Sequence, residues 1–306
     1  MLTISKDRKF KQVDVFTSVP LQGNPLAVIM ESDGLSPEQM QKIAGWTNLS
    51  ETTFILPATE PNADYQVRIF TPEKELPFAG HPTLGTAHAL LEDGIQTKTP
   101  NRIVQQCGVG LVEIAIAGEP SQADRTLSFR SPPGNVSQIY DQSKLSVLTD
   151  ALDISATIDT AHLPASVDMG IRWLIIRLKS ALDVLAFVPK NLAALLSLPQ
   201  QFQVDGFSIY GVYEENQLPG INYEIRAFCI EHNTVVEDPV TGSANACLSR
   251  LLQEQGFPDR GRTAQSYLVR QGTLRQRDGR ILVTYFEGQP WIGGQATTLI
   301  KGTISI

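Results

Sequence analysis

The sequence predicts an α+β protein made of two like lobes, in each of which mostly antiparallel strands surround one apolar helix. Two observations predict this class. Short strand-like segments outnumber helical ones along the chain, and one helical segment occurs twice. The sequence from Gly80 to Gly94 aligns with the sequence from Gly242 to Gly256, with the first glycine, a leucine and the last glycine at matching positions. We interpret this as an internal duplication, the alternative being a chance match of short patterns.

Segments on either side of the two helices repeat as well. Arg68-Ile-Phe70 precedes the first helix, and Arg226-Ala-Phe228 precedes the second. Downstream, Val104-Gln-Gln-Cys-Gly108 resembles Val269-Arg-Gln-Gly272. Because few positions on either helix are polar, we expect both helices to be buried over most of their circumference.

In the first lobe, apolar alternation and β-branched or aromatic content predict the strands. A helix is expected from Ser36 to about Trp46, because Ser36 and Gln39 can form a capping box with Pro37 at the first helical position. A second helix of small and apolar residues is closed by Gly94. The expected strands are 9–16, 26–30, 52–56, 65–70, 102–106, 111–116 and 126–129, and the second helix is 80–91.

The second lobe has the same alternation of strands and helices. Its expected strands are 170–178, 207–213, 222–228, 267–271, 281–286 and 295–300, and its expected helices are 138–148, 190–198 and 242–255. The turn-rich stretch Ser131-Pro-Pro-Gly-Asn135 is the expected linker. We therefore expect lobes at 1–130 and 131–297, with a C-terminal strand at about 298–306 returning to the first lobe.

Composition excludes several classes of protein. Of the 306 residues 42% are hydrophobic and 19% charged, which excludes disorder for most of the chain. A net charge of −7 without a basic run gives no electrostatic footprint for nucleic acid or an anionic membrane. The apolar stretch 173–178 is too short to span a bilayer, and segment 1–10 is too polar for a signal peptide. Three scattered cysteines argue against a disulfide framework or a zinc site. We expect a soluble, cytoplasmic protein.

Both repeated helices begin with glycine followed by a polar residue. A helix start carries unpaired N–H groups and positive partial charge, and glycine lets a ligand approach the backbone closely. If the two lobes face each other, the starts at Gly80 and Gly242 meet in one cleft suited to a carboxylate or a developing enolate oxygen. The alternative is that both glycines only relieve crowding between helix and strand.

Glu51 and His81 are the candidate acid–base residues of the first lobe. Glu51 lies where a helix ends and a strand begins, and a carboxylate there acts as a general base if burial raises its pKa. His81 follows Gly80 at a helix start, where the dipole disfavours imidazolium and favours a neutral ring. The alternatives are a solvated glutamate and a histidine that only caps its helix.

In the second lobe, Asp238 and Ser243 lie just before and at the start of the repeated helix. Asp238 is a candidate to orient His81, and Ser243 is a candidate to bind an anionic substrate group. The alternatives are that Asp238 caps a turn and that Ser243 caps its own helix. A Ser-His-Asp hydrolase triad is disfavoured, because the chain has no Gly-x-Ser-x-Gly elbow.

No pattern predicts a metal or a nucleotide cofactor. His81 and His88 are seven residues apart on one helix, about 10 Å along its axis, which is too far to chelate one ion. Phosphate-loop and dinucleotide-binding glycine motifs do not occur. We therefore expect neither metal nor cofactor, and a small carboxylate as the ligand.

Several segments together resemble the signature segments of the PhzF-like phenazine-biosynthesis family. They are Asp14-Val-Phe with Gly23-Asn-Pro25, Asn48-Leu-Ser-Glu-Thr52, Ala79-Gly-His-Pro-Thr83 and Glu237-Asp-Pro-Val-Thr-Gly-Ser-Ala244. The resemblance is ordered and covers residues from about 10 to 300. It implies two pseudo-symmetric lobes of the diaminopimelate epimerase type, each with a sheet rolled around a central helix. It also implies a homodimer and catalysis without a metal or organic cofactor.

The family's best-understood member uses a carboxylate to move a proton within dihydro-3-hydroxyanthranilate. The resemblance gives that role to Glu51, and the remaining catalytic positions fall on His81, Asp238 and Ser243. The substrate-binding positions that it implies are Gly80, Gly242, Ser50 and Asn24.

Related epimerases and racemases carry one cysteine before each of these glycines, where this chain has Ala79 and Thr241. Neither side chain serves as a base near neutral pH, and Cys247 lies more than a helical turn away from the expected position. The leading hypothesis is thus a cofactor-independent isomerase that uses a single carboxylate on a cyclic or unsaturated acid. Two alternatives stay open: an epimerase or racemase using Glu51 and His81, and a non-catalytic binding or adaptor protein.

Overall fold

The computed structural model describes residues 6–118, 125–231, 233–259 and 261–306, so half of the polar segment 1–10 lies outside it. The chain forms two compact units. Unit 1 comprises residues 1–130 and 293–306, and unit 2 comprises residues 131–292. Each unit has its own central helix.

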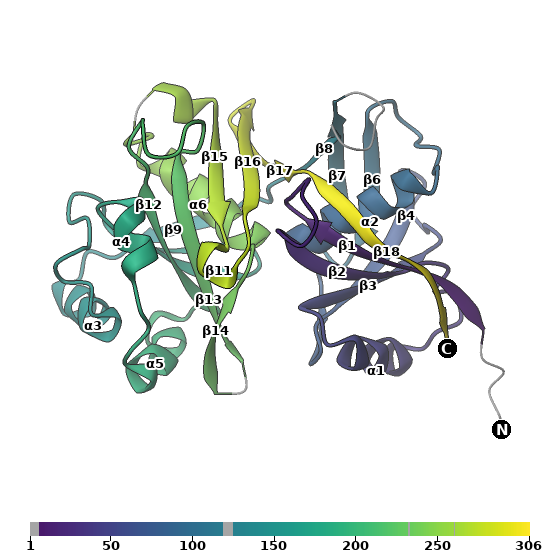
Figure 1. The fold of residues 1–306 in the computed structure, drawn as a ribbon, viewed down its shortest axis with the longest axis horizontal. Coiled ribbons are helices and arrows are strands. Elements are labelled where there is room, and N and C mark those ends of the chain that lie inside the picture. The colour runs from purple at the N-terminus through teal and green to yellow at the C-terminus, as the bar shows by residue number, and fades with distance from the viewer. Residues whose placement is uncertain (1–5, 119–124, 232, 260) are drawn as a thin grey trace. The chain divides into compact units, whose positions relative to one another are not determined.

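Unit 1 is built from one sheet and two helices. Its elements are β1 (Asp7–Val15), β2 (Asn24–Ile29), α1 (Pro37–Thr47), β3 (Glu51–Leu56), β4 (Tyr65–Phe70), β5 (Glu75–Leu76), α2 (Gly80–Glu92), β6 (Arg102–Cys107), β7 (Gly110–Ala117), β8 (Thr126–Arg130) and β18 (Ala296–Ser305). The order in the sheet is β18-β1-β2-β3-β4-β6-β7-β8, and β5 pairs with β4. Neighbours are antiparallel except β2 with β3 and β4 with β6. Figure 1 shows β18, in yellow, beside β1.

The sheet of unit 1 is rolled around α2. This helix contacts β1, β2, β3, β6, β8 and β18, and every residue from Gly80 to Leu90 is buried. Glycine at position 85 is required by packing, since a Cβ there would lie 2.6 Å from the Leu26 side chain. The expectation of an apolar helix buried around most of its circumference is therefore confirmed for α2.

Unit 2 is built in the same way around α6. Its elements are β9 (Asn135–Gln138), α3 (Gln142–Leu152), β10 (Ala165–Asp168), β11 (Arg172–Arg177), α4 (Ala181–Ala186), α5 (Leu192–Phe202), β12 (Gly206–Val212), β13 (Tyr223–Glu231), β14 (Thr234–Asp238), α6 (Gly242–Glu254), β15 (Ser266–Gln271) and β16 (Gly279–Phe286), with short 3₁₀ turns at Gly261–Ala264 and Thr273–Arg275. Strand β17 (Gln289–Gly294) begins in unit 2 and ends in unit 1. The sheet order is β9-β10-β11-β12-β13-β15-β16, and β14 pairs with β13. Only β11 with β12 and β13 with β15 are parallel in this order.

The two units repeat one topology. Each has an antiparallel pair, a parallel step with helix in the connection, a hairpin, the central helix, and a second parallel step. The hairpin is β4–β5 before α2 in unit 1 and β13–β14 before α6 in unit 2. The fold class predicted from the internal repeat, two pseudo-symmetric α+β lobes, is confirmed.

An arginine–glutamate pair closes each of these hairpins. Arg68 donates from Nε and Nη2 to Glu75 at 2.7 and 2.6 Å, and Arg226 donates from the same atoms to Glu237 at 2.8 and 2.9 Å. In each case the guanidinium also lies about 5 Å from the ring of the phenylalanine two residues later. The repeated Arg-x-Phe pattern in the sequence therefore marks a repeated contact that fixes the strand leading into the central helix.

Local sequence signals agree with the structure in most places. Ser36 and Gln39 form both hydrogen bonds of the predicted capping box at α1. The helix expected at 138–148 was wrong at its start: Gln138 ends β9, and α3 begins after Asp141, whose carboxylate caps it. Strands β5, β9, β10, β14 and β17 and helix α4 were not predicted, because they are short or lie in turn-rich sequence.

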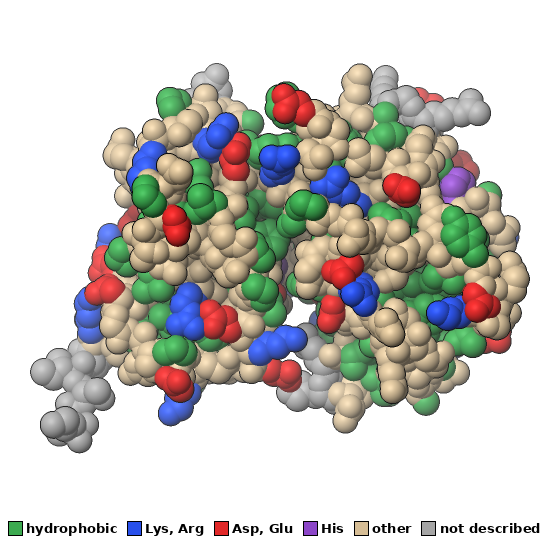
Figure 2. All heavy atoms as spheres, turned by 180° about the vertical axis from the view of Figure 1, so that it is seen from behind, with side chains coloured by type: hydrophobic (Ala, Val, Ile, Leu, Met, Phe, Trp, Pro, Cys, Tyr) green, Lys and Arg blue, Asp and Glu red, His purple; other side chains and the backbone are tan. Residues whose placement is uncertain are grey.

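The surface carries both signs of charge. On the face drawn in Figure 2, Lys and Arg side chains are interspersed with Asp and Glu, and no broad basic area is seen. Within the described part of the chain, no helix is long and apolar enough to cross a membrane.

A buried polar network ties the last turn of α2 to β1 and β18. His88 is 3% exposed, and its Nε2 lies 3.2 Å from Oγ1 of Thr298. The Thr298 hydroxyl donates to Glu92, so the ring nitrogen is the donor to Thr298. Lys11 lies 2.8 Å from Glu92 and donates to the carbonyl of Ala89 at 2.8 Å. Burial lowers the pKa of His88 to about 4.

We predict that His88→Gln makes the protein less sensitive to acid. In the unfolded chain the His88 ring takes up a proton near pH 6.5, whereas in the folded state its pKa is about 4. The free energy of unfolding therefore falls as the pH falls from 6.5 to 4. Glutamine still donates to Thr298 but does not titrate, which should remove about 2–3 kcal/mol of this loss. Urea unfolding at pH 7, 5.5 and 4 measures the effect, and parallel curves for the two proteins would contradict it.

Candidate active site

Unit 1 brings Asn24, Glu51 and His81 together. Glu51 begins β3, Asn24 begins β2, and His81 lies in the first turn of α2. Oε2 of Glu51 is 3.2 Å from Nε2 of His81, and Nδ2 of Asn24 is 3.5 Å from Nδ1 of His81. The side chains of Glu51 and His81 are 15% and 6% exposed. A carboxylate and an imidazole in contact, largely shielded from water, form a candidate acid–base pair.

The parallel pairing of β2 and β3 is what places two of these residues. Leu26 pairs with Glu51 in the register, so Asn24 lies two residues away on the neighbouring strand. The turn before Asn24 is held by the Asp14 carboxylate, which accepts a hydrogen bond from the Gly23 N–H at 3.1 Å. A Cβ at Gly23 would lie 2.2 Å from a backbone oxygen, so only glycine fits. The Gly-Asn-Pro motif therefore fixes the turn that positions Asn24 at the start of β2.

The geometry assigns a tautomer to His81. The amide nitrogen of Asn24 carries only hydrogens, so the ring nitrogen that faces it is an acceptor. The proton of the neutral ring is then on Nε2, the nitrogen that lies 3.2 Å from Oε2 of Glu51. Burial lowers the pKa of His81 to about 3, which keeps the ring neutral at physiological pH. His81 is therefore neutral and lies in contact with the Glu51 carboxyl group, without the alignment of a hydrogen bond.

The start of α2 is open. The residue at its N-cap is Ala79, which makes no side-chain hydrogen bond to the first turn. Gly80 is buried in that first turn, and Ser50, which is exposed, directly precedes Glu51. A helix start without a cap keeps its N–H groups and its positive partial charge for a ligand.

Unit 2 places Asp238 at the end of β14 and Ser243 in the first turn of α6. Oδ2 of Asp238 accepts a hydrogen bond from the Thr241 hydroxyl at 2.6 Å. Ser243 does not cap its own helix, because Thr241 is the N-cap residue and α6 has no side-chain cap hydrogen bond. Gly242 is buried beside them. The prediction that Asp238 orients His81 stays a prediction.

Two site residues escaped the sequence analysis. The indole Nε1 of Trp173, which is 2% exposed, donates to Ser243 Oγ at 3.0 Å. Gln271 binds the loop before α6 through its side-chain amide. A signal for Trp173 did exist, because a tryptophan in an apolar strand needs a partner for its N–H. For Gln271 the only sequence signal was its place in Val269-Arg-Gln-Gly272, the segment that resembles one after the first repeated helix.

The cysteines do not supply a base. All three are free thiols, and Cys247 is buried within α6 with its Sγ 3.5 Å from the carbonyl oxygen of Val167. Burial raises the pKa of the Cys247 thiol. The described residues contain no group of three His, Cys, Asp or Glu side chains that could hold a metal ion.

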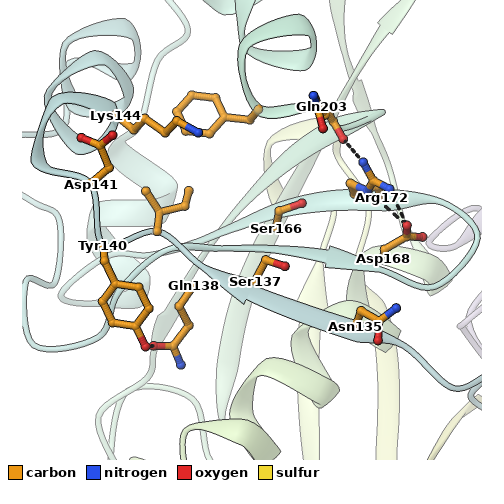
Figure 3. Close-up of a pocket in the computed structure, with 12 residues that line it drawn as sticks. Asn135, Ser137, Gln138, Tyr140, Asp141, Lys144, Ser166, Asp168, Arg172 and Gln203 are labelled. Carbon is orange, nitrogen blue, oxygen red and sulfur yellow. Dashed lines mark hydrogen bonds and ion pairs between the residues drawn. The ribbon is translucent and has the colours of Figure 1, made fainter.

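A surface pocket of about 480 Å³ lies elsewhere in unit 2 (Figure 3). It is lined by β9, β10 and the start of α3, and none of the predicted site residues belongs to it. Arg172 in its lining donates to Asp168 at 2.6 Å and to the backbone oxygen of Gln203 at 2.8 Å.

Comparison with known proteins identifies the family. The family described as phenazine biosynthesis-like protein, PhzC-PhzF, matches residues 13–302. Antisense-enhancing sequence 1 of Schizosaccharomyces pombe is 37% identical over 97% of this chain and 98% of its own. An uncharacterized isomerase of Pasteurella multocida is 33% identical over 96% of this chain and 93% of its own. The trans-2,3-dihydro-3-hydroxyanthranilate isomerase of Pseudomonas aeruginosa is 47% identical over 35% of this chain and 37% of its own.

The fold has solved counterparts. The crystal structure of a PhzF-family phenazine biosynthesis protein from Bacillus anthracis matches with a TM-score of 0.81 and 23% identity, covering 98% of this chain and 100% of that one. Fold and site define a protein of two compact units with a carboxyl–imidazole contact, the candidate acid–base pair, in its first unit. The chain belongs to the PhzC-PhzF family. The expectation of an isomerase is confirmed at the level of enzyme class by the relatives that carry this name.

We predict that the His81 ring keeps one neutral form from pH 8 to pH 5. Its burial holds the pKa near 3, and Asn24 selects the form with the proton on Nε2. Long-range ¹H–¹⁵N NMR spectra of the imidazole nitrogens, assigned with a His81→Gln variant, measure both properties. A titration midpoint near 6.5, or a proton on Nδ1, would show that the assigned pairing is wrong.

Proposed function

We propose that this protein is a cofactor-independent isomerase that moves a proton within a small carboxylate-bearing substrate, cyclic or unsaturated, with Glu51 as the base. The observation that carries the proposal is the 3.2 Å contact between Glu51 Oε2 and the neutral His81 Nε2 in a largely buried setting. This pair sets a single carboxyl group beside a neutral imidazole, which does not neutralise it as an imidazolium would.

The proposed reaction is a balanced proton transfer. Glu51 removes a proton from a carbon that conjugation makes acidic, and the electron pair spreads over the neighbouring unsaturated bonds. The carboxylic acid so formed returns the same proton to another carbon of that system, and no electrons leave the substrate. His81 Nε2, 3.2 Å from Oε2 of Glu51, is close enough to stabilise the carboxylate that Glu51 carries before the first step and regains after the second.

The anionic group of the substrate needs donors. Backbone N–H groups at Gly80 are available in unit 1, since α2 has no side-chain cap. The sequence assigns Gly242, Ser243 and Asp238 of unit 2 to the same substrate, and this assignment remains part of the proposal. The named substrate of the Pseudomonas aeruginosa relative has the required features, a ring, a double bond and a carboxylate, and is the first compound to assay.

An epimerase with two opposed thiols is not supported. The positions before Gly80 and Gly242 carry alanine and threonine, and both are N-cap residues in the structure. Neither side chain accepts a proton near neutral pH. The buried Cys247 thiol has a raised pKa and is bonded toward a strand carbonyl.

We predict that Glu51→Gln abolishes turnover while the fold is kept. Glutamine is close in size to glutamate but takes up no proton, so kcat should fall at least about 10²-fold. The assay follows trans-2,3-dihydro-3-hydroxyanthranilate and a panel of unsaturated cyclic acids in D₂O, with product and deuterium content read by mass spectrometry.

The matched control is Glu60→Gln, which neutralises an exposed glutamate of the same unit and should leave kcat unchanged. Full activity of Glu51→Gln on any compound that the wild type converts would remove Glu51 from the role of base. If a compound binds to the wild type and no panel member is ever converted or exchanged, the reading as a binding protein gains support instead.

We further propose that the protein is a cytoplasmic homodimer, as the family resemblance implies. The three free cysteines are compatible with a reducing compartment. Sedimentation at micromolar concentration should give twice the mass of one chain. A mass of one chain at every concentration would overturn the dimer, and it would leave the assignment of Glu51 untouched.

A further inference from the structure

Gln271, the last residue of β15, is fully buried and uses all of its hydrogen-bonding capacity around the start of α6. Its Nε2 donates to Oγ1 of Thr241 at 2.8 Å and to the carbonyl of Asp238 at 3.1 Å. Its Oε1 accepts from the N–H of Thr241 at 2.9 Å and from Nδ2 of Asn245 at 3.2 Å. A side-chain amide has two donors and two acceptor sites, and here each has a partner.

This clamp changes what Thr241 does. Threonine is a favoured N-cap residue because its hydroxyl accepts a hydrogen bond from the second or third N–H of the helix. In α6 the Thr241 hydroxyl instead donates to Asp238 Oδ2 and accepts from Gln271, and no side chain caps the helix. The Thr241 hydroxyl is thus engaged by Asp238 and by the amide that Gln271 donates, and it makes no hydrogen bond to the first turn of the helix.

The equivalent start in unit 1 reaches the same state by another route. The N-cap of α2 is Ala79, which has no hydroxyl to turn inward. A buried glutamine is present there as well: Gln105 of β6 donates to Thr83 Oγ1 at 3.0 Å and accepts from the Tyr65 hydroxyl at 2.9 Å. Both central helices thus begin without a side-chain cap, in unit 1 by the choice of alanine and in unit 2 through Gln271.

We propose that Gln271 is a positioning residue that holds the Thr241 hydroxyl away from the first turn of α6, so that the N–H groups of Ser243 and Ala244 stay open to an anionic substrate group. The inference rests on the proposed function, which supplies the anion. An open helix start carries about half a positive charge and N–H groups suited to a carboxylate. A threonine cap would fill that position with the protein's own oxygen.

The test is backbone amide hydrogen exchange of Ser243 and Ala244 in the full chain without ligand, measured by NMR for wild type and Gln271→Met. Methionine fills the space but offers no hydrogen bond, so Thr241 is free to cap the helix. Exchange of at least one of the two amides should slow by about fivefold, the protection that one cap hydrogen bond gives. A merely structural role for Gln271 predicts the opposite, since a loosened helix start exchanges faster.

Two further variants make the result specific. In Thr241→Ala/Gln271→Met no hydroxyl is left, so exchange should return to the wild-type rate or above it. Gln271→Glu keeps the acceptor oxygen and removes the donor to Thr241, and it should slow exchange even if the methionine variant does not fold. Gln255→Met is the matched control, because Gln255 bonds to the carbonyl of Leu163 at the other end of α6.

Unchanged or faster exchange in the folded single variants would overturn the proposal, as would slow exchange that persists in the double variant. These measurements need no substrate. Failure of the proposed isomerase activity, tested with Glu51→Gln, is therefore seen separately from failure of the role given to Gln271.

Discussion

The burial of a neutral imidazole against Glu51 is the constraint on which the proposed chemistry depends. A charged His81 would form an ion pair with the carboxylate and weaken it as a base, whereas a neutral ring in contact with it does not. Three pieces of local structure produce this state. The parallel step from β2 to β3 sets Asn24 near Glu51, the Asp14–Gly23 turn aims the asparagine, and α2 begins with the imidazole inside the unit.

The two units share a backbone framework and differ in the side chain at the start of the central helix. Each presents an Arg–Glu closed hairpin, a central helix with an open start and a buried glutamine on a later strand. At the second position of the helix, however, unit 1 has His81 and unit 2 has Ser243. The acid–base pair therefore belongs to one unit only. Such a division suits a reaction in which one group both removes and returns the proton, and it does not suit two matched bases on opposite faces.

Much of this could be predicted because the decisive signals are local. The capping box at Ser36, the glycine that opens α2 and the alternation of the longer strands are each set by neighbouring residues, and the internal repeat joined them into a fold. The Gly-Asn-Pro motif also pointed to the site, although its mechanical reason, the close backbone approach at Gly23, needs three dimensions.

The remainder depends on contacts between distant segments. The α3 boundary was misplaced because Gln138 pairs with Ala165 in a strand that its own neighbours do not indicate. Trp173 and Ser243 are 70 residues apart, and only the packing of β11 against α6 joins them. The role of Gln271 could not be predicted for the same reason. A buried amide acquires its meaning from partners such as Thr241 and Asn245, which no sequence window contains together with it.

The most direct measurement of the central claim is a neutron crystal structure of the protein near pH 7, which locates the protons between Glu51 and His81. The account predicts a deuteron on Nε2 of His81 directed at an ionised Glu51, with Nδ1 bare and facing the Asn24 amide. A deuteron on the Glu51 carboxyl, or on both nitrogens of the ring, would contradict it, because the base would then be protonated already or paired with a charged imidazolium.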